Sequence, residues 1–267
     1  MAMTAFFSDL DRTLIFSHRI ALPQEKLVVE LLNGREQSYM TCRTLAYLQN
    51  AAWLRLVPVT MRSCEQYERV TVFRTLLPCR YALVCNGGVL LADGETDRAW
   101  LAETRRLAAN ELRELERAVR IFESLADPVR TPMDLMAYAL CGDPEDTARK
   151  LREAVDGSLL AVRADRGKLY CLPRSIHKGA ALARFRERFA VDTAIAAGDS
   201  VFDLPMLNAA DYAIAPQAIA GQVRCANTIA AAGERPFSDE ICDVLETLRP
   251  PENFVGRHLQ PCPDVLE

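Results

Sequence analysis

The sequence predicts an α/β fold, in which a doubly wound, mostly parallel Rossmann-like sheet carries an inserted α+β unit. Short apolar runs alternate with helical segments near both ends of the chain, as in a parallel sheet covered by helices on both faces. From residue 89 to 173 the pattern changes to a long amphipathic helix followed by hairpin-like strands. We therefore expect a core domain over residues 1–88 and 174–250, an inserted domain over 89–173, and an irregular tail over 251–267.

The first core segment divides into alternating strands and helices. Thr4–Ser8 is short, apolar and aromatic, as a buried central strand is. Lys26–Met40 is predicted as two strands joined at Asn33-Gly34, a dipeptide that favours a hairpin turn. The remaining expected elements are a helix capped by Thr41, a strand over Leu54–Val59 ending at Thr60, a helix over Cys64–Leu77 and a strand over Tyr81–Cys85.

The inserted unit and the second core segment follow the same rules. Apolar residues at helical spacing predict one long helix over Ala99–Leu125. We expect strand material over Val129–Leu140, a helix over Pro144–Val155 capped by Asp143, and a hairpin of Leu159–Arg163 with Lys168–Leu172. Beyond Pro173 we expect helices over Lys178–Phe189, Leu204–Ala209 and Ser238–Leu248, the last capped by Ser238, and strands over Thr193–Ala197 and Tyr212–Ala215, the latter closing the sheet.

Composition narrows the class of protein. The 267 residues carry a formal net charge of −4, which argues against a nucleic-acid partner bound through a broad basic surface. No apolar run approaches the length of a membrane-spanning helix, and the N-terminus lacks the basic lead of a signal peptide. Nine scattered cysteines without a CxxC pair indicate free thiols in a reducing compartment, so we expect a cytoplasmic protein. Nothing in the sequence indicates an oligomeric state.

Reactive side chains occur at four places that follow predicted strands or open a helix. They are the pair Asp9 and Asp11, Thr60, Lys178, and the pair Asp199 and Asp203. Any one of them alone is explained by an ordinary turn, cap or solvated side chain. Ligands bind at the carboxyl ends of strands in open α/β sheets, so four such places in one sheet indicate an active site.

These segments resemble the motifs of the haloacid dehalogenase superfamily of phosphohydrolases. The matching residues are Asp9-Leu10-Asp11-Arg12-Thr13, Thr60, Lys178 and Gly198-Asp199-Ser200-Val201-Phe202-Asp203, in the family's order. The inserted unit lies between the second and third motifs. That position is similar to the cap domain of the type IIB, Cof-like and sucrose-phosphatase-like subgroup.

The resemblance implies a mechanism for the hydrolysis of a phosphate ester. Asp9 would be the nucleophile that forms an aspartyl-phosphate, and Asp11 would protonate the leaving group and then activate water. Two carboxylates beside a phosphate dianion need a cation, which the resemblance supplies as Mg²⁺. Asp9, the backbone carbonyl of Asp11, and Asp199 would bind it, with Asp203 as direct or water-mediated support.

Further residues take their roles from the same resemblance. Thr60, Met61 and Lys178 would bind the phosphoryl group, and Arg62 and Ser200 are candidates for substrate contact. Asn86 and Gly87 resemble the hinge between core and cap. The sequence departs from the usual family pattern at Arg12, Met61 and Phe202, where glycine, glycine and asparagine are common. Candidate specificity residues, by polarity alone, are Arg130, Asp134, Arg163 and Arg166, while His18 and His177 are more simply explained as structural or surface residues.

The implied activity is that of a Mg²⁺-dependent phosphomonoesterase acting on a small phosphorylated metabolite, a sugar phosphate or sugar-acid phosphate. A phosphomutase or phosphotransferase using the same aspartyl-phosphate remains an alternative, as does a slow binding protein on the same fold. The 51 residues from Asp9 to Thr60 exceed the roughly 30 that a strand–helix–strand crossover needs. We therefore expect the hairpin Lys26–Met40 to be a flap over the active site, unless it merely extends the sheet away from it.

Overall fold

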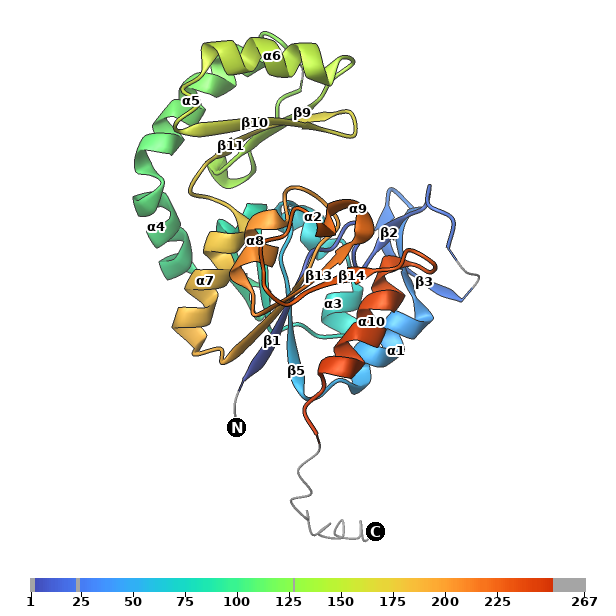
Figure 1. Cartoon of the computed structure of the whole chain (residues 1–267). Coiled ribbons are helices and arrows are strands. Elements are labelled where there is room, and N and C mark those ends of the chain that lie inside the picture. The colour runs from blue at the N-terminus through green and yellow to red at the C-terminus, as the bar shows by residue number, and fades with distance from the viewer. Residues whose placement is uncertain (1–2, 23–24, 127, 252–267) are drawn as a thin grey trace, which may run out of the picture.

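The computed structural model describes residues 3–22, 25–126 and 128–251 (Figure 1). Of the tail predicted over residues 251–267, all but residue 251 lies outside these residues. Among them, no helix is long and apolar enough to cross a membrane.

The core is a five-stranded sheet in which every neighbouring pair is parallel, as the sequence predicted. Side chains of the strand over Thr4–Ser8 alternate between two apolar clusters, Phe6 packing on one face of the sheet and Phe7 on the other. Helices cover both faces (Figure 1). In spatial order the strands are β14 (Thr228–Ala231), β13 (Tyr212–Pro216), β12 (Thr193–Ala197), β1 (Thr4–Ser8) and β5 (Leu54–Pro58).

Two predictions for the C-terminal part of the core are wrong. The strand predicted to close the sheet, now β13, is followed by a further strand, β14, which lies at the edge of the sheet and has one fully buried side chain. Ser238 does not cap the last helix, α10 (Phe237–Leu248), which begins after Pro236 without a side-chain cap. The Ser238 side chain is instead buried, and its Oγ has no hydrogen-bond partner among the described residues.

The hairpin predicted from Asn33-Gly34 is present, as β3 (Lys26–Leu32) and β4 (Arg35–Thr41) joined by two residues with positive φ. It pairs with β2 (Phe16–Ser17) in a separate small sheet. Thr41 caps α1 (Cys42–Asn50) as predicted, accepting a hydrogen bond from the backbone N–H of Thr44.

The single helix predicted over Cys64–Leu77 is wrong. Two short helices occur instead, α2 (Cys64–Glu68) and α3 (Val72–Thr75). Between them Val70 forms an antiparallel bridge with Glu30 of β3, at the point where the helix is interrupted.

The inserted region contains a helix pair and an antiparallel sheet of order β10-β11-β9. The long helix predicted over Ala99–Leu125 is broken at Ala108, because its first part packs Trp100 on the core while its second packs Leu115 in the inserted region's own apolar cluster. The elements are α4 (Arg98–Leu107), α5 (Ala109–Glu123), a 3₁₀ turn (Pro132–Asp134), β9 (Ala137–Leu140), α6 (Pro144–Ala154, capped by Asp143), β10 (Leu160–Asp165) and β11 (Lys168–Pro173).

Residues at the start of the inserted region pair with a strand of the first core segment in a separate three-stranded sheet, which a parallel bridge between Val59 and Leu83 joins to the core. The strand β6 (Tyr81–Val84) pairs with β7 (Val89–Ala92), which pairs with β8 (Glu95–Thr96). The connection between β6 and β7 is the 3₁₀ turn Cys85–Gly87. The remaining core helices are α7 (Lys178–Phe189), α8 (Leu204–Ala209) and α9 (Gln217–Ala220).

The two chain segments that link the core to the antiparallel sheet touch each other. Asn86 Nδ2 donates a 2.7 Å hydrogen bond to the carbonyl of Ile176, and Trp100 Nε1 donates to the carbonyl of Gly87. Gly87 has φ +88°, and a Cβ there would lie 2.3 Å from Cβ of Ala181. Only glycine therefore fits at this position. The two hydrogen bonds place Asn86 and Gly87 where the two linking segments meet, the position predicted for a hinge.

Candidate active site

Asp9, Lys178 and Asp203 form a buried charged cluster at the carboxyl edge of the sheet. Asp9 directly follows β1, Lys178 is the first residue of α7, and Asp203 precedes α8. The Lys178 ammonium donates to Asp9 Oδ1 at 2.5 Å and to Asp203 Oδ1 at 2.6 Å, and its side chain is 1% exposed. Thr13 donates to the other Asp9 oxygen at 3.1 Å. The Asp9 carboxylate is therefore held in one orientation.

A third carboxylate, Asp199, completes a group that fits a divalent cation. Oxygen atoms of Asp9, Asp199 and Asp203 all lie within 4.8 Å of one another. Carboxylate oxygens are the ligands that Mg²⁺ prefers. The Asp11 carboxylate is not part of this group, and both Asp203 oxygens already accept hydrogen bonds, from Lys178 and from the hydroxyl and N–H of Ser200.

The electrostatics of this group also favour a cation. Burial raises the pKa of Asp9 to about 8, because the opposing charge of Lys178 does not offset burial and the neighbouring carboxylates Asp203, Asp199 and Asp11. Burial and Asp203 likewise raise the pKa of Asp199. A divalent cation among these oxygens would relieve the repulsion.

Glycine is required at the turn that carries Asp199. A Cβ at Gly198 would lie 2.3 Å from Cβ of Asp203, closer than any real Cβ contact. The absence of a side chain lets the Gly198–Asp203 loop fold back so that Asp199 and Asp203 face the same space.

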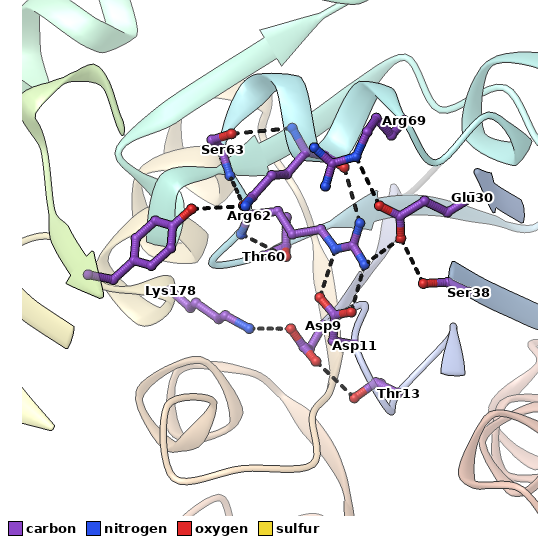
Figure 2. A network of polar contacts seen from close by, with 12 residues as sticks. Asp9, Asp11, Thr13, Glu30, Ser38, Thr60, Arg62, Ser63, Arg69 and Lys178 are labelled. Carbon is purple, nitrogen blue, oxygen red and sulfur yellow. Dashed lines mark hydrogen bonds and ion pairs between the residues drawn. The ribbon is translucent and has the colours of Figure 1, made fainter. Parts of the chain in front are cut away.

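Asp11 lies beside this cluster in an ion pair with Arg62 (Figure 2). Arg62 Nε and Nη2 donate to the two Asp11 oxygens at 2.8 Å each, a bidentate arrangement. Although desolvation would raise the pKa of Asp11, the hydrogen bonds and charge of Arg62 outweigh it and lower that pKa below its usual value. In this arrangement Asp11 is an ionised hydrogen-bond acceptor.

The hairpin contributes a residue that the sequence did not reveal. Glu30 of β3 is 4% exposed and accepts hydrogen bonds from Arg62 at 3.0 Å, Arg69 at 3.1 Å and Ser38 at 2.7 Å (Figure 2). The only signal was a carboxylate placed among apolar residues of a strand. Glu30 and Asp11 thus hold the Arg62 guanidinium from two sides.

Among the described residues, none of the hairpin Lys26–Met40 lines the cavity above Asp9, and its tip residues Leu31 and Leu32 are exposed. The hairpin therefore does not cover the cavity as the flap hypothesis predicted, and its contact with the site is the one from Glu30 to Arg62.

The Glu30→Gln variant is expected to lower kcat about tenfold with little change in KM, because a neutral amide holds Arg62, and through it Asp11, less firmly. Glu36→Gln, at an exposed residue of β4 in the same hairpin, is the matched control and should leave both constants unchanged. Steady-state kinetics on one phosphate ester measures both. Equal kcat values for Glu30→Gln and the control would show that Glu30 only supports the fold.

A cavity of about 420 Å³ lies over the charged cluster, between the core and the hairpin β10–β11. Thr60 and Met61, which follow β5, line it beside Lys178, and Thr60 Oγ1 accepts a hydrogen bond from the N–H of Arg62. Its lining residues are Asp9, Asp11, Arg12, Ser17, Arg19, Ile20, Thr60, Met61, Asp165, Arg166, Lys168, Tyr170, Lys178, Asp199, Ser200 and Phe202.

The inserted region reaches the core carboxylates directly. Arg166, at the β10–β11 turn, donates to Asp199 Oδ2 at 3.2 Å, and Arg12 approaches the same oxygen at 3.2 Å. Phe202, which stands where the family commonly has asparagine, contacts the Tyr170 ring edge-on at 5.5 Å. Of the polar candidates for specificity, Arg166 lines the cavity, whereas Arg130, Asp134 and Arg163 do not.

Both histidines near the motifs lie outside the cavity. His177 caps α7, its Nδ1 accepting a hydrogen bond from the N–H of Ala180, and burial lowers its pKa. His18 is exposed, and its Nδ1 lies 3.3 Å from the carbonyl of Gln37. Neither lines the cavity.

No family model and no curated protein sequence matches this chain. Among solved structures, the sucrose-phosphatase from Synechocystis sp. PCC6803, in complex with sucrose and phosphate, is similar with a TM-score of 0.64 at 16% identity, over 92% of this chain and 98% of that one. A sugar phosphatase of haloacid dehalogenase subclass IIB gives 0.62 at 12% identity, over 92% and 99%. A trehalose-6-phosphate phosphatase related protein gives 0.51 at 19% identity, over 92% and 98%. The chain therefore has the fold of the haloacid dehalogenase superfamily phosphatases, the fold that its sequence motifs predicted.

Proposed function

We propose that this protein is a Mg²⁺-dependent phosphomonoesterase that hydrolyses a small phosphorylated metabolite, a sugar phosphate or sugar-acid phosphate, through an aspartyl-phosphate. The observation that carries the proposal is the Asp9–Lys178–Asp203 cluster with Asp199 beside it, at the bottom of a cavity bounded by core and cap. The sugar phosphatases that share the fold support the class of substrate.

Asp9 is the proposed nucleophile. Its fixed orientation between Lys178 and Thr13 presents a carboxylate to a phosphoryl group entering from the cavity. Lys178 and Thr60 are placed to contact phosphoryl oxygens, and the Lys178 charge would stabilise the negative charge of the transition state.

Asp9, Asp199 and the backbone carbonyl of Asp11 are the proposed Mg²⁺ ligands, with Asp203 in support. When bound, the ion would neutralise phosphoryl charge and polarise the ester for attack. In the structure, hydrogen bonds from Lys178 and from Ser200 orient the carboxylate of Asp203, which lies within 4.8 Å of that of Asp199.

Asp11 is the proposed proton carrier. While Arg62 binds both its oxygens, Asp11 is ionised, which is the protonation state needed to accept a proton from water in the second half of the reaction. To protonate a leaving alkoxide it must first gain a proton, so the Arg62 pair would have to loosen when substrate enters.

Hydrolysis of p-nitrophenyl phosphate tests the function. The purified protein should release p-nitrophenolate with Mg²⁺, stop when EDTA is added, and recover when Mg²⁺ is restored in excess. No phosphate release from this ester or from a panel of sugar phosphates, with Mg²⁺ present, would contradict the proposal.

The Asp199→Ala variant is expected to raise the Mg²⁺ concentration for half-maximal rate at least about tenfold, because Mg²⁺ sites use few protein carboxylates and each matters. Titration of activity against Mg²⁺ measures the shift. Asp211→Ala, a carboxylate outside the cavity that pairs with Arg186, is the control. Superimposable titrations for Asp199→Ala and the unmodified protein would place the ion elsewhere.

A further inference from the structure

The outer part of the cavity, which we call the rim, is strongly cationic. Its charged residues are Arg12, Arg19, Arg166 and Lys168, against the single carboxylate Asp165. The other four charged groups of the lining, Asp9, Asp11, Lys178 and Asp199, form the floor and are used by the proposed phosphoryl and metal chemistry. The rim residues therefore remain to contact the rest of the substrate, away from the phosphate that is cleaved.

Two of these cations have no carboxylate partner. Within the described ranges, neither the guanidinium of Arg19 nor the ammonium of Lys168 forms an ion pair. Arg19 follows β2 on the core, and Lys168 begins β11 on the cap, so they approach the cavity from opposite domains. The field of Lys168 extends into the floor, where it contributes to lowering the pKa of Asp11.

The other two rim cations share one oxygen. Arg12 and Arg166 each lie 3.2 Å from Asp199 Oδ2, and Arg166 Nε also lies 3.7 Å from Asp165 Oδ1. Half-exposed side chains at this distance keep donors available to a ligand.

Resting on the function proposed above, we propose that the substrate carries a second anionic group, a carboxylate or a second phosphate, which Arg19 and Lys168 bind from the two domains. An anion between them would form charge-assisted hydrogen bonds that a hydroxyl group cannot match. Recognition from both sides would also favour closure of the cap over a doubly anionic substrate.

A matched pair of esters tests this inference. 6-Phosphogluconate and sorbitol 6-phosphate share six carbons and one phosphate and differ at carbon 1, a carboxylate in the first and a hydroxymethyl group in the second. kcat/KM should be at least about tenfold higher for 6-phosphogluconate. Fructose 1,6-bisphosphate against fructose 6-phosphate makes the same comparison with a phosphate as the second anion, and a preference in either pair supports the inference and identifies the anion.

Charge removal at the rim should reduce that preference. Lys168→Met and Arg19→Met should each lower the ratio of the two kcat/KM values severalfold, the loss falling mainly on the doubly anionic ester. Arg113→Met, an exposed cap residue outside this cavity, should leave the ratio unchanged. Equal kcat/KM values within both pairs, or a ratio unaffected by both rim variants, would overturn the inference.

Binding separates this inference from the proposed function. Calorimetric titration of the Asp9→Asn protein with each ester should show the same preference without any turnover. Preferential binding without phosphate release from any ester would contradict the function and leave the rim assignment standing. Turnover of all esters with equal binding would support the function and contradict the rim assignment.

Discussion

Asp9→Asn is expected to abolish turnover while leaving the protein folded. An amide has nearly the volume of the carboxylate but is a far weaker nucleophile, so covalent catalysis is lost. We expect kcat to fall by several orders of magnitude, each tenfold corresponding to about 1.4 kcal/mol of barrier. Steady-state kinetics on p-nitrophenyl phosphate measures the loss.

The fold of the Asp9→Asn protein can be checked independently. Thr13 can still donate to the amide oxygen, Lys178 keeps Asp203 as a partner, and one of three crowded carboxylates is gone. The thermal midpoint should therefore not fall. Activity within tenfold of the unmodified protein would remove Asp9 from the role of nucleophile.

Lys178→Met is expected to damage both activity and stability. It leaves the buried carboxylates of Asp9 and Asp203 without their shared cation, and breaking a buried pair costs about 3–5 kcal/mol. Removal of one group that stabilises transition-state charge should also lower kcat by about 10²–10³.

Thermal unfolding and kinetics without and with saturating Mg²⁺ measure the two effects of Lys178→Met. Lys150→Met, which removes an exposed lysine paired with Asp146, is the control and should change neither property. If both variants melted at the same temperature, the Lys178 ammonium would not be stabilising the fold through its pairs with Asp9 and Asp203.

The core strands and their chemistry were predictable because both are local. A buried parallel strand is a short apolar run, and Asp9, Thr60 and Asp199 stand next to such runs in the sequence. The edge strand β14 (TIAA) has a similar short apolar run but was not predicted; only one of its side chains is fully buried, and the run itself does not show that it pairs with β13. The break at Ala108 was not predicted for another reason. The apolar residues keep a helical spacing across the break, although the two helices pack in different apolar clusters.

Contacts between distant segments were not predictable from the pattern. Glu30 accepts a hydrogen bond from Arg62, 32 residues away, and Arg166 of the cap donates to Asp199 of the core. Such pairs depend on how the hairpin and the cap are placed on the core, which no local spacing encodes. Arg62 itself was predicted as a substrate contact, and the structure instead pairs it with Asp11.

The aspartyl-phosphate is tested most directly by the pre-steady state of Asp11→Asn with p-nitrophenyl phosphate. p-Nitrophenolate leaves without protonation, so the first half of the reaction needs no acid, whereas hydrolysis of the intermediate still needs a base, which the substituted amide cannot supply. The account predicts a burst of one p-nitrophenolate per active site, then a slow steady rate, with phosphate recovered on the peptide that contains Asp9. A linear time course with no burst and no phosphorylated peptide would contradict it.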